Sequence, residues 1–458
     1  MAQQKDIFRK SAEAPAQFLE RTIVTTKVLS DSLHNDPVIK RGEDYWHMLG
    51  PGLTTGASDD DPSGIATYSQ TGAQFGYHLL WLAGWTFPLA AIVQEMCARI
   101  GLVTGRGLAS NIRTHFSKRV LYVCAGALFI ANAVNIGADL GAMAKGAQLL
   151  NPKLNFSWLV VGFTALSLGL QIFTPYVRYA RYLKWLAMVL LAYVFSALLA
   201  HLGWHDILSN TLIPKINFNK EELILICAVL GTTISPYLFF WQTSQEVEEQ
   251  ILQGKTTVAE RRTATAPEDI KGMRIDVWSG MFLSEIVMFF IIAACGGILY
   301  THGITTITSA AQAAEALRPF AGNATYFLFA IGIIGTGLLA IPVLAGSSSY
   351  TISESFRWKE GLYRNLNQAR AFYGIIIISM LIGLGMNFLG IDPIKALIYS
   401  ALVNGLVAPI VLALIVLIGS NKKTMGRWVN KRSTTVAGWV ITAIMTVAGV
   451  AAIISLFS

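Results

Sequence analysis

Charged residues are scarce in this chain of 458 residues: Asp, Glu, Lys and Arg together make up 14% of it, whereas 53% of it is hydrophobic. Its mean hydropathy is +0.52. So small a charged fraction excludes an ordinary soluble domain of this size, in which about a quarter of the residues carry a charge. A helix needs about 20 mostly apolar residues to cross a bilayer. We therefore expect an all-α polytopic membrane protein.

Cysteine and histidine are also scarce, and neither type is clustered. The four cysteines stand singly in apolar segments without CxxC spacing, which indicates helix packing and not a disulfide or a metal cluster; they are Cys97, Cys124, Cys227 and Cys295. The seven histidines fall in the N-terminal segment, in loops or at the ends of spans; they are His34, His47, His78, His115, His201, His205 and His302. This placement argues against a histidine zinc site and against a histidine proton relay at the membrane midplane.

Long apolar runs predict eleven spans. They lie near 48–76, 78–100, 120–150, 156–174, 183–203, 222–245, 275–300, 324–350, 370–389, 396–419 and 435–457. Residues 1–44 are polar and mixed in charge, without the short apolar core and cleavage site of a signal peptide. We expect residues 1–44 to form a cytosolic tail and residues 45–458 to form the transmembrane domain.

The positive charges predict the orientation. Most of the 35 Lys and Arg fall in the tail and in every second loop, which is typical of cytoplasmic segments. The exceptions are Lys145 within a span and five residues in the alternate loops, Lys153, Lys215, Lys220, Arg318 and Lys395. We expect a multi-pass protein of a bacterial inner membrane with a cytoplasmic N-terminus. The net charge of +8 then reports orientation and not nucleic-acid binding. The lipid bilayer is an expected partner, and no obligate protein partner is expected.

Two spans contain helix breakers at corresponding places. The first contains Asp61-Pro62-Ser63-Gly64, and the sixth contains GTTISPY over residues 231–237. Non-helical backbone persists at membrane depth only where protein or water surrounds it. Spans one and six are five apart, as expected if helices 1–5 and 6–10 form an inverted repeat, and such paired breaks mark transporter binding sites. Each proline could instead merely kink its helix, but two breaks in register, one beside three carboxylates, favour a site.

The two breaks together offer hard oxygen donors to a cation. We expect Asp61 as the central ligand, Asp60 as a second charge, and Asp59 facing the vestibule. Hydroxyls of Thr232 and Ser235 and backbone carbonyls near Gly64 and Gly231 would complete the shell. Oxygen-only sites suit Mg²⁺, Ca²⁺ and Mn²⁺, and Mg²⁺ usually keeps several of its waters. No cofactor is expected, because the divalent cation is the substrate.

Other polar residues within spans leave alternatives open. An intramembrane carboxylate such as Asp139 is a functional candidate by default, or it pairs with Lys145 or a helix terminus. Glu285 is ambiguous. Asn404 could reach the cavity, but an interhelical hydrogen bond is favoured. Glu95 is expected to pair with Arg99 one turn later, near the inner end of the second span.

Several motifs resemble those of a known family. Gly50-Pro51-Gly52 through Asp61-Pro62, then GAQFGY at 72–77, Ala98-Arg99 and Val103-Thr104-Gly105, resemble the first two helices of the Nramp family of divalent-metal transporters. The resemblance extends from about residue 45 over most of the chain. It implies the leucine-transporter-like fold, with inverted five-helix repeats and broken helices 1 and 6.

The departures from the family pattern bear on selectivity. The family's Asp-Pro-Gly-Asn motif here ends in Ser63 and Gly64, so the coordinating aspartate remains and the asparagine is lost. In the sixth helix the metal-binding methionine is replaced by Ser235 and the following histidine by Tyr237, while a second family histidine falls at Gln242. This combination resembles the divergent branch called Nramp-related magnesium transporters, in which a wider site takes a largely hydrated ion without proton symport.

The sequence therefore predicts a divalent-cation uptake transporter that works by alternating access and is not an enzyme. Mg²⁺ is the favoured substrate, Mn²⁺ is also carried, and no proton is coupled. One alternative is proton-coupled Mn²⁺ or Fe²⁺ uptake, with Asp139 or Glu285 in place of the missing histidines. A less favoured alternative is a sodium-coupled amino-acid or amine symporter of the same fold. An intramembrane aspartyl protease would need Asp61 and Asp139 within hydrogen-bond reach.

Overall fold

The computed structural model describes residues 45–46, 48–198, 203–307, 310–389 and 393–457. The helices named α3 to α20 all belong to one compact unit, Gly50–Ser458. Among the described residues every regular element is a helix, which confirms the all-α prediction. The predicted tail, residues 1–44, lies outside the described residues, so the division into a tail and a transmembrane domain stays a prediction.

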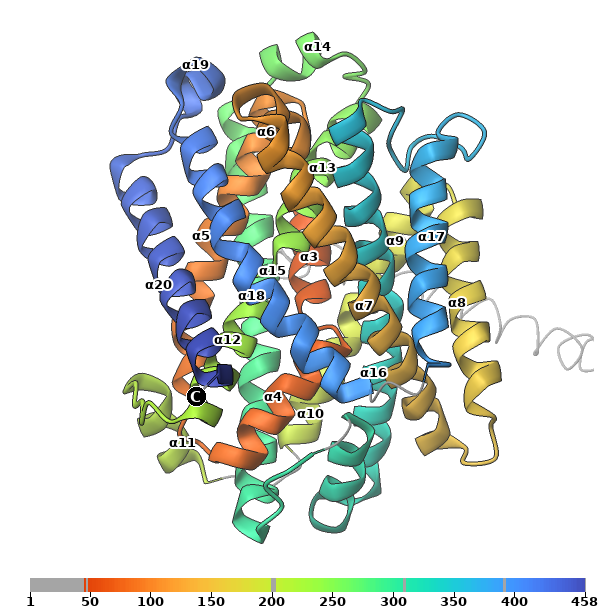
Figure 1. Cartoon of the computed structure of the whole chain (residues 1–458), viewed down its shortest axis with the longest axis vertical. Coiled ribbons are helices and arrows are strands. Elements are labelled where there is room, and N and C mark those ends of the chain that lie inside the picture. Colours follow the sequence, from red (N-terminus) through yellow and green to blue (C-terminus); the bar gives the residue numbers. More distant parts are fainter. Residues whose placement is uncertain (1–44, 47, 199–202, 308–309, 390–392, 458) are drawn as a thin grey trace, which may run out of the picture. The chain divides into compact units, whose positions relative to one another are not determined.

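Both predicted breaks interrupt a helix. The first span consists of α3 (Pro51–Asp59) and α4 (Pro62–Phe75), and the sixth consists of α12 (Lys220–Thr233) and α13 (Pro236–Leu252). Proline has no N–H to donate and restricts the residue before it, so each second half begins at its proline. In Figure 1, α3 and α13 lie in the upper half and α4 and α12 in the lower half. The two broken helices thus run in opposite directions, as an inverted repeat requires.

The remaining helices complete two sets. In the first half of the chain they are α5 (Trp81–Thr104), α6 (Leu108–His115), α7 (Lys118–Leu150), α8 (Phe156–Phe173), α9 (Tyr176–Leu186), the 3₁₀ turn η1 (Ala187–Leu190), α10 (Leu191–Leu198) and α11 (Trp204–Leu212). In the second half they are α14 (Val258–Thr263), α15 (Pro267–Ile298), η2 (Tyr300–His302), α16 (Ala310–Phe356), α17 (Arg370–Met386), α18 (Pro393–Gly419), α19 (Lys422–Met425), η3 (Gly426–Trp428) and α20 (Arg432–Phe457).

Eight helices among the described residues are long and apolar enough to cross a membrane. The other predicted spans are built differently. The break divides the first span into two short halves, η1 interrupts the fifth, and α17 is an apolar helix of 17 residues. The count of eleven spans therefore stays a prediction.

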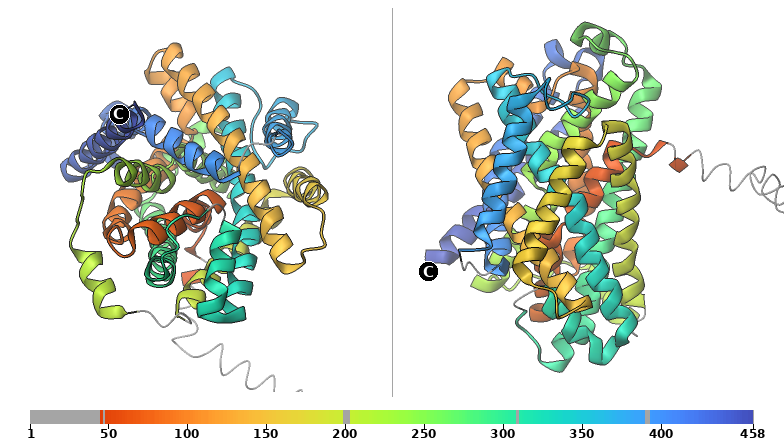
Figure 2. Two further views of the ribbon diagram at one scale, coloured as in Figure 1. Left: turned by 60° about the horizontal axis from the view of Figure 1, so that its bottom comes forward. Right: turned by 90° about the vertical axis from the view of Figure 1, so that its right-hand side faces the viewer.

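Polarity is distributed as in a protein surrounded by lipid. Large apolar side chains point outward from α8 and α20, where Trp158 is 76% exposed, Phe173 is 83% exposed and Val447 is 69% exposed. These two helices lie at opposite edges of the helical unit (Figures 1 and 2). The carboxylates of the first break are instead fully enclosed, at 1% exposure or less. In water this arrangement would be unfavourable, whereas in a bilayer it leaves apolar groups in hydrocarbon and polar groups among protein.

Helix α15 fixes the position of α3 and, through it, of the first break. A Cβ placed on Gly56 would overlap the backbone of Gly280, and one on Gly280 would overlap the carbonyl of Gly52. The side chain of Asp276 accepts hydrogen bonds from the backbone N–H groups of Gly50 (2.7 Å), Gly52 (2.6 Å) and Leu53 (2.9 Å). Unpaired N–H groups at a helix start are thereby satisfied by a carboxylate. Small-residue packing of this kind lets two membrane helices approach closely.

We expect Gly280→Ala to destabilise the protein by about 1–3 kcal/mol or more, because the added methyl group overpacks the contact between α3 and α15. Gly272→Ala on the same helix is the matched control, since a Cβ there meets nothing within 4 Å. The control should be neutral or slightly stabilising. Thermal unfolding of the purified protein in detergent measures both. Equal melting temperatures for the two variants would contradict the close packing described here.

Candidate metal site at the two helix breaks

The first break is stabilised by Asp61, which is the N-cap of α4. Asp60 ends α3 at φ −85° and ψ 49°, and Asp61 follows in extended conformation at φ −65° and ψ 167°. Asp61 Oδ1 accepts hydrogen bonds from the Gly64 N–H at 2.7 Å and from Ser63 Oγ at 2.7 Å. Asp61 Oδ2 accepts one from Asn135 Nδ2 of α7 at 2.6 Å. These donors fix the orientation of the carboxylate, and a carboxylate offers about four lone-pair positions, so it can still bind a cation.

The second break uses its serine in another way. Ser235 is the N-cap of α13, but its hydroxyl does not cap that helix. Ser235 Oγ lies 2.7 Å from the Gly231 carbonyl oxygen and 2.6 Å from that of Thr232. A hydroxyl has one hydrogen to donate, so it satisfies one of these two carbonyls at a time. The carbonyls of Gly231 and Thr232 are therefore not as free as the sequence predicted, because they share the hydroxyl of Ser235 as their one donor.

The two breaks lie against each other. A Cβ on Gly64 would lie 3.3 Å from Thr232 Oγ1 and 3.1 Å from the Asp59 carbonyl oxygen. One turn along α4, Tyr68 Oη is 3.3 Å from Thr233 Oγ1. Only a residue without a side chain leaves room at position 64 without pushing Thr232 away. Of the predicted residues, Asp61, Gly64, Gly231, Thr232 and Ser235 therefore belong to one pair of adjoining breaks.

Helix α7 presents one polar face to the first break. Asn135 holds Asp61, and Asp139, four residues later, interacts electrostatically with Asp61. Both carboxylate oxygens of Asp139 are buried without a hydrogen-bond partner. Its proposed pairing with Lys145 is not found, because Lys145 is exposed and its Nζ lies 5.1 Å from the centroid of the Phe156 ring. Within the described residues no hydrogen bond joins Asp61 and Asp139, so the geometry gives the aspartyl-protease alternative no support.

A second group of carboxylates lies on the other side of the break. Asp59 Oδ2 accepts a hydrogen bond from Ser284 Oγ at 2.8 Å, and Glu285 Oε2 accepts one from Thr86 Oγ1 at 2.9 Å. Asp60 interacts electrostatically with Asp59 and Glu285, and neither of its own carboxylate oxygens has a partner. Asp59 is 0% exposed. In this conformation Asp59 is enclosed and bonded to α15, and its expected position facing the vestibule stays a prediction.

The remaining predicted residues have different surroundings. Tyr237 Oη donates to the Ser58 carbonyl at 2.9 Å and so ties α13 to the end of α3. Gln242 donates to Glu246 on its own helix at 2.9 Å. Asn404 is buried, its Oδ1 has no hydrogen-bond partner, and the neighbouring Gly405 packs against Gly231. Tyr237 and Asn404 thus adjoin the breaks.

Two expectations outside the breaks also have outcomes. Glu95 does lie 3.9 Å from Arg99, but its shorter contacts are with α15: Arg274 Nη2 and Trp278 Nε1 each donate at 2.9 Å. All four cysteines are free and buried, as helix packing predicts.

Asn135 and Asp276 are structurally important residues that sequence reasoning missed. Asn135 lies one helical turn before Asp139, so the 3.6-residue period placed it on the same face. Asp276 lies near the start of the seventh span, and nothing in the sequence indicates that it reaches α3.

The donor set defines what the site could hold. Among the described residues no three His, Cys, Asp or Glu side chains lie close enough to bind one metal ion together. A cation between the breaks would therefore meet the Asp61 carboxylate, neutral hydroxyl and carbonyl oxygens, and water. Such a set fits a hard cation that keeps part of its hydration shell.

Comparison with known proteins gives the family. Residues 52–455 match the family described as natural resistance-associated macrophage protein-like, Nramp. The divalent metal cation transporter MntH of Klebsiella pneumoniae (strain 342) is 28% identical over 402 residues, which cover 87% of this chain and 91% of the relative. The MntH protein of Caldanaerobacter subterraneus is 25% identical over 409 residues, covering 88% and 91%.

Solved structures agree with the fold. The Eremococcus coleocola manganese transporter superposes with a TM-score of 0.69 at 19% identity, covering 89% of this chain and 86% of that one. Mhp1, a nucleobase-cation-symport-1 family transporter, superposes with a TM-score of 0.57 at 16% identity, covering 89% and 91%. With its paired broken helices and a family match over most of its length, the chain belongs to the Nramp family of metal-ion transporters, has the leucine-transporter-like fold, and is not an enzyme.

Proposed function

We propose that this protein takes up divalent cations across the inner membrane of a bacterium by alternating access, with Mg²⁺ as the favoured substrate and Mn²⁺ also carried. The MntH relatives are named as divalent metal cation transporters, which supports the substrate class. The observation that carries the proposal is the Asp61 carboxylate, fully enclosed and held by three donors where two broken helices meet.

The preference for Mg²⁺ rests on the chemistry of the donors. Asp61, Thr232, Ser235 and the carbonyl of Gly231 offer oxygen only, and oxygen favours Mg²⁺ and Mn²⁺ over the later transition metals. Ser235 stands where the family has a thioether, so the soft ligand is lost. Gly64 adds no side chain to the space beside Thr232, which supports binding of an ion that retains water.

The membrane potential is a sufficient driving force for such uptake. Moving one charge through 100 mV is worth about 2.3 kcal/mol, so a dication gains about twice that amount. We propose that the N-terminus and the Lys- and Arg-rich loops around α6, α14 and α19 lie in the cytoplasm. These three helices lie together at the top of Figure 1, away from α11.

Proton-coupled Mn²⁺ or Fe²⁺ transport is the second candidate, and a specific observation favours it. Asp139 and Glu285 are buried carboxylates near the site, and each has an oxygen without a hydrogen-bond partner. Buried carboxylates of this kind serve as proton carriers in pumps and transporters. Against it, Tyr237 and Gln242 occupy the positions of the family's two histidines.

We expect Asp61→Ala to abolish measurable binding of Mg²⁺ and Mn²⁺, because it removes the carboxylate that opposes the charge of the dication. Titration calorimetry with Mg²⁺, Mn²⁺ and Ca²⁺, together with uptake into proteoliposomes, measures the loss. Glu268→Ala, which removes an exposed carboxylate of α15, is the control and should bind like the wild type. Wild-type affinity in the Asp61 variant would refute the site.

Asn135→Ala should weaken cation binding about 10-fold to 100-fold, as expected when a hydrogen bond that orients a metal ligand is lost. Asn132→Ala is the matched control on the same helix. Asn132 donates to the Leu344 carbonyl and to Ser348 of α16, and not to Asp61. If calorimetry gives the two variants the same affinity, Asn135 does not act through Asp61.

Proton coupling can be tested with proteoliposomes that contain a pH-sensitive dye. We expect Mg²⁺ or Mn²⁺ to enter without acidifying the lumen, because no histidine lies at either break. The control is the same preparation with a protonophore and a defined potential, in which uptake should persist. Acidification that follows cation entry, and that is lost in Asp139→Asn or Glu285→Gln, would establish the proton-coupled alternative.

A further inference from the structure

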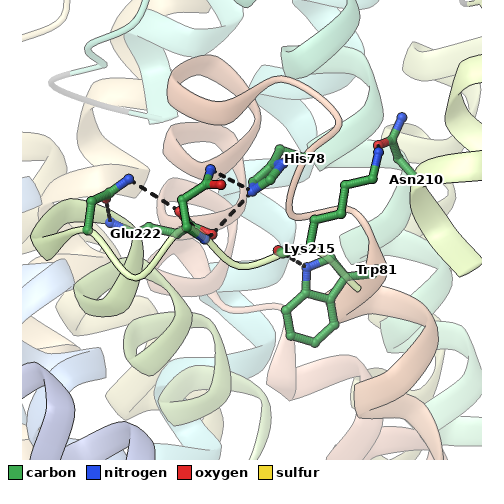
Figure 3. Close-up of polar contacts among 7 residues, drawn as sticks. His78, Trp81, Asn210, Lys215 and Glu222 are labelled. Atoms are coloured by element: carbon green, nitrogen blue, oxygen red, sulfur yellow. Dashed lines mark hydrogen bonds and ion pairs between the residues drawn. The ribbon is translucent and has the colours of Figure 1, made fainter. Parts of the chain in front are cut away.

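A polar cluster joins the far ends of the two half-helices that carry Gly64 and Thr232. Helix α4 ends at Phe75 and α12 begins at Lys220. Three residues beyond α4, His78 Nε2 lies 3.2 Å from Glu222 Oε1, in the first turn of α12. Figure 3 shows the two side chains facing each other. We name His78, Asn217, Asn219 and Glu222 the outer cluster, after the face on which the charge pattern places it.

Glu222 is held firmly within this cluster. It is 0% exposed, and its carboxylate accepts hydrogen bonds from the Asn217 N–H at 3.1 and 3.2 Å and from Asn219 Nδ2 at 3.3 Å. Its own N–H donates to Asn219 Oδ1 at 2.8 Å, which caps α12. Between the two asparagines, Phe218 has φ of 55°, a left-handed conformation that bulky residues rarely adopt. The segment before α12 is thus shaped around this carboxylate.

The histidine nitrogen faces two groups that make opposite demands. His78 Nε2 lies 3.2 Å from Glu222 Oε1, an acceptor, and 3.0 Å from Asn217 Nδ2, a donor. A ring nitrogen with a proton can only donate, and one without a proton can only accept. A neutral imidazole carries its proton on one nitrogen only. Its Nε2 can therefore either donate to Glu222 or accept from Asn217, but not both at once. Imidazolium carries protons on both nitrogens, so its Nε2–H donates a charge-assisted bond to Glu222, and the Asn217 amide must then offer its oxygen instead of its nitrogen.

We propose that His78 and Glu222 are positioning residues for transport: their contact holds the outer ends of α4 and α12 together, and protonation of His78 strengthens it. This inference rests on the proposed function. Helix α12 is continuous from Glu222 to Thr233 and α4 from the first break to Phe75, and a turn in which the His78 N–H donates to the Phe75 carbonyl at 3.0 Å links His78 to α4. The two half-helices also touch at Tyr68 and Thr233. A change in their spacing at the outer end therefore reaches Gly64 and Thr232. Cation affinity then depends on external pH although no proton is carried.

Other ionisable groups lie near His78, on its own loop or on neighbouring elements. Tyr77 is the neighbour of His78 in the same loop. Burial and the Asp206 carboxylate of α11 raise the pKa of Tyr77, so this phenol is neutral in the pH range of interest. Lys215 turns away, with its Nζ 3.3 Å from Asn210 Oδ1 (Figure 3). The remaining charged or titratable residues nearby in sequence on the packed elements are His205, Lys220, Glu221, Tyr300 and His302. Histidine changes charge between about pH 5 and 8, which sets the range to test.

The experiment measures KM and maximal rate for Mg²⁺ uptake into proteoliposomes at external pH 5.5 to 8.5. We expect the KM of His78→Gln to exceed that of the wild type by at least about threefold at pH 5.5 and to equal it at pH 8.5, since only the charged imidazole is lost. Low pH also affects other carboxylates, but it does so equally in the wild type and in His78→Gln. The ratio of their KM values therefore isolates the contribution of His78. Glu222→Gln, which removes the charge from the partner, should give the same ratios. A ratio that does not vary with pH would overturn the proposal.

Trp81→Phe is the matched control. Trp81, the first residue of α5, donates from Nε1 to the Lys215 carbonyl at 3.2 Å (Figure 3). Lys215 lies in the loop that also contains Asn217, but this contact involves no charged group. Its KM relative to the wild type should be the same at every pH. A pH-dependent ratio in this variant would show that general loosening of the loop, and not the His78 contact, causes the effect.

Hydrogen exchange tests the contact without transport. In the wild type, amides of residues 213–223 should be more protected at pH 6 than at pH 8 after correction for the intrinsic rate, and His78→Gln should remove the difference. If the wild type transports no divalent cation, the proposed function fails. Hydrogen exchange still tests whether protonation of His78 strengthens its contact with Glu222. Equal corrected protection at both pH values would overturn the inference even if transport is normal.

Discussion

The structure depends on one interaction, the capping of α4 by the carboxylate of Asp61. A proline at position 62 forces the backbone out of the helix inside the membrane, where unpaired N–H groups cost several kcal/mol each. Asp61 satisfies the Gly64 N–H and is itself held by Ser63 and Asn135. A break that would be unfavourable in lipid thereby becomes a preorganised anionic group surrounded by protein. The second break adjoins it at Thr232, so the same arrangement supplies both charge and neutral oxygen.

The helices around the breaks explain how several carboxylates are accommodated. Helix α15 supplies Ser284 to Asp59 and its own Asp276 to the start of α3, and its glycine contact holds α3 close. Helix α7 supplies Asn135 from the opposite side. Asp60 and Asp139 keep unpartnered oxygens within this enclosure. Buried carboxylates without partners are costly, so they favour a cation, water or a proton at this place, which is what a cation pathway requires.

The two half-helices α4 and α12 connect this enclosure to the outer cluster. Near the breaks they meet at Gly64 and Thr232 and at Tyr68 and Thr233, and at the other end His78, in the turn after α4, contacts Glu222 of α12. A transporter of this fold works by moving such elements as units around a fixed site. A pair of half-helices that are in contact both near the breaks and at their far ends can move as one body. The contact farthest from the breaks is the one that contains a histidine and a carboxylate.

The sequence by itself determined the helical class, the two breaks and their correspondence, and it placed an aspartate at the first of them, because proline and intramembrane carboxylates act locally and are readable one residue at a time. It also placed Asn135 and Asp139 on one helical face, through their spacing. Only the tertiary structure decided that Asp276 caps α3, that Ser235 turns back to the α12 carbonyls, that Asp59 is covered by α15, and that His78 meets Glu222. Most of these contacts join residues far apart in the chain, and their geometry follows from how whole helices pack, which no local pattern encodes.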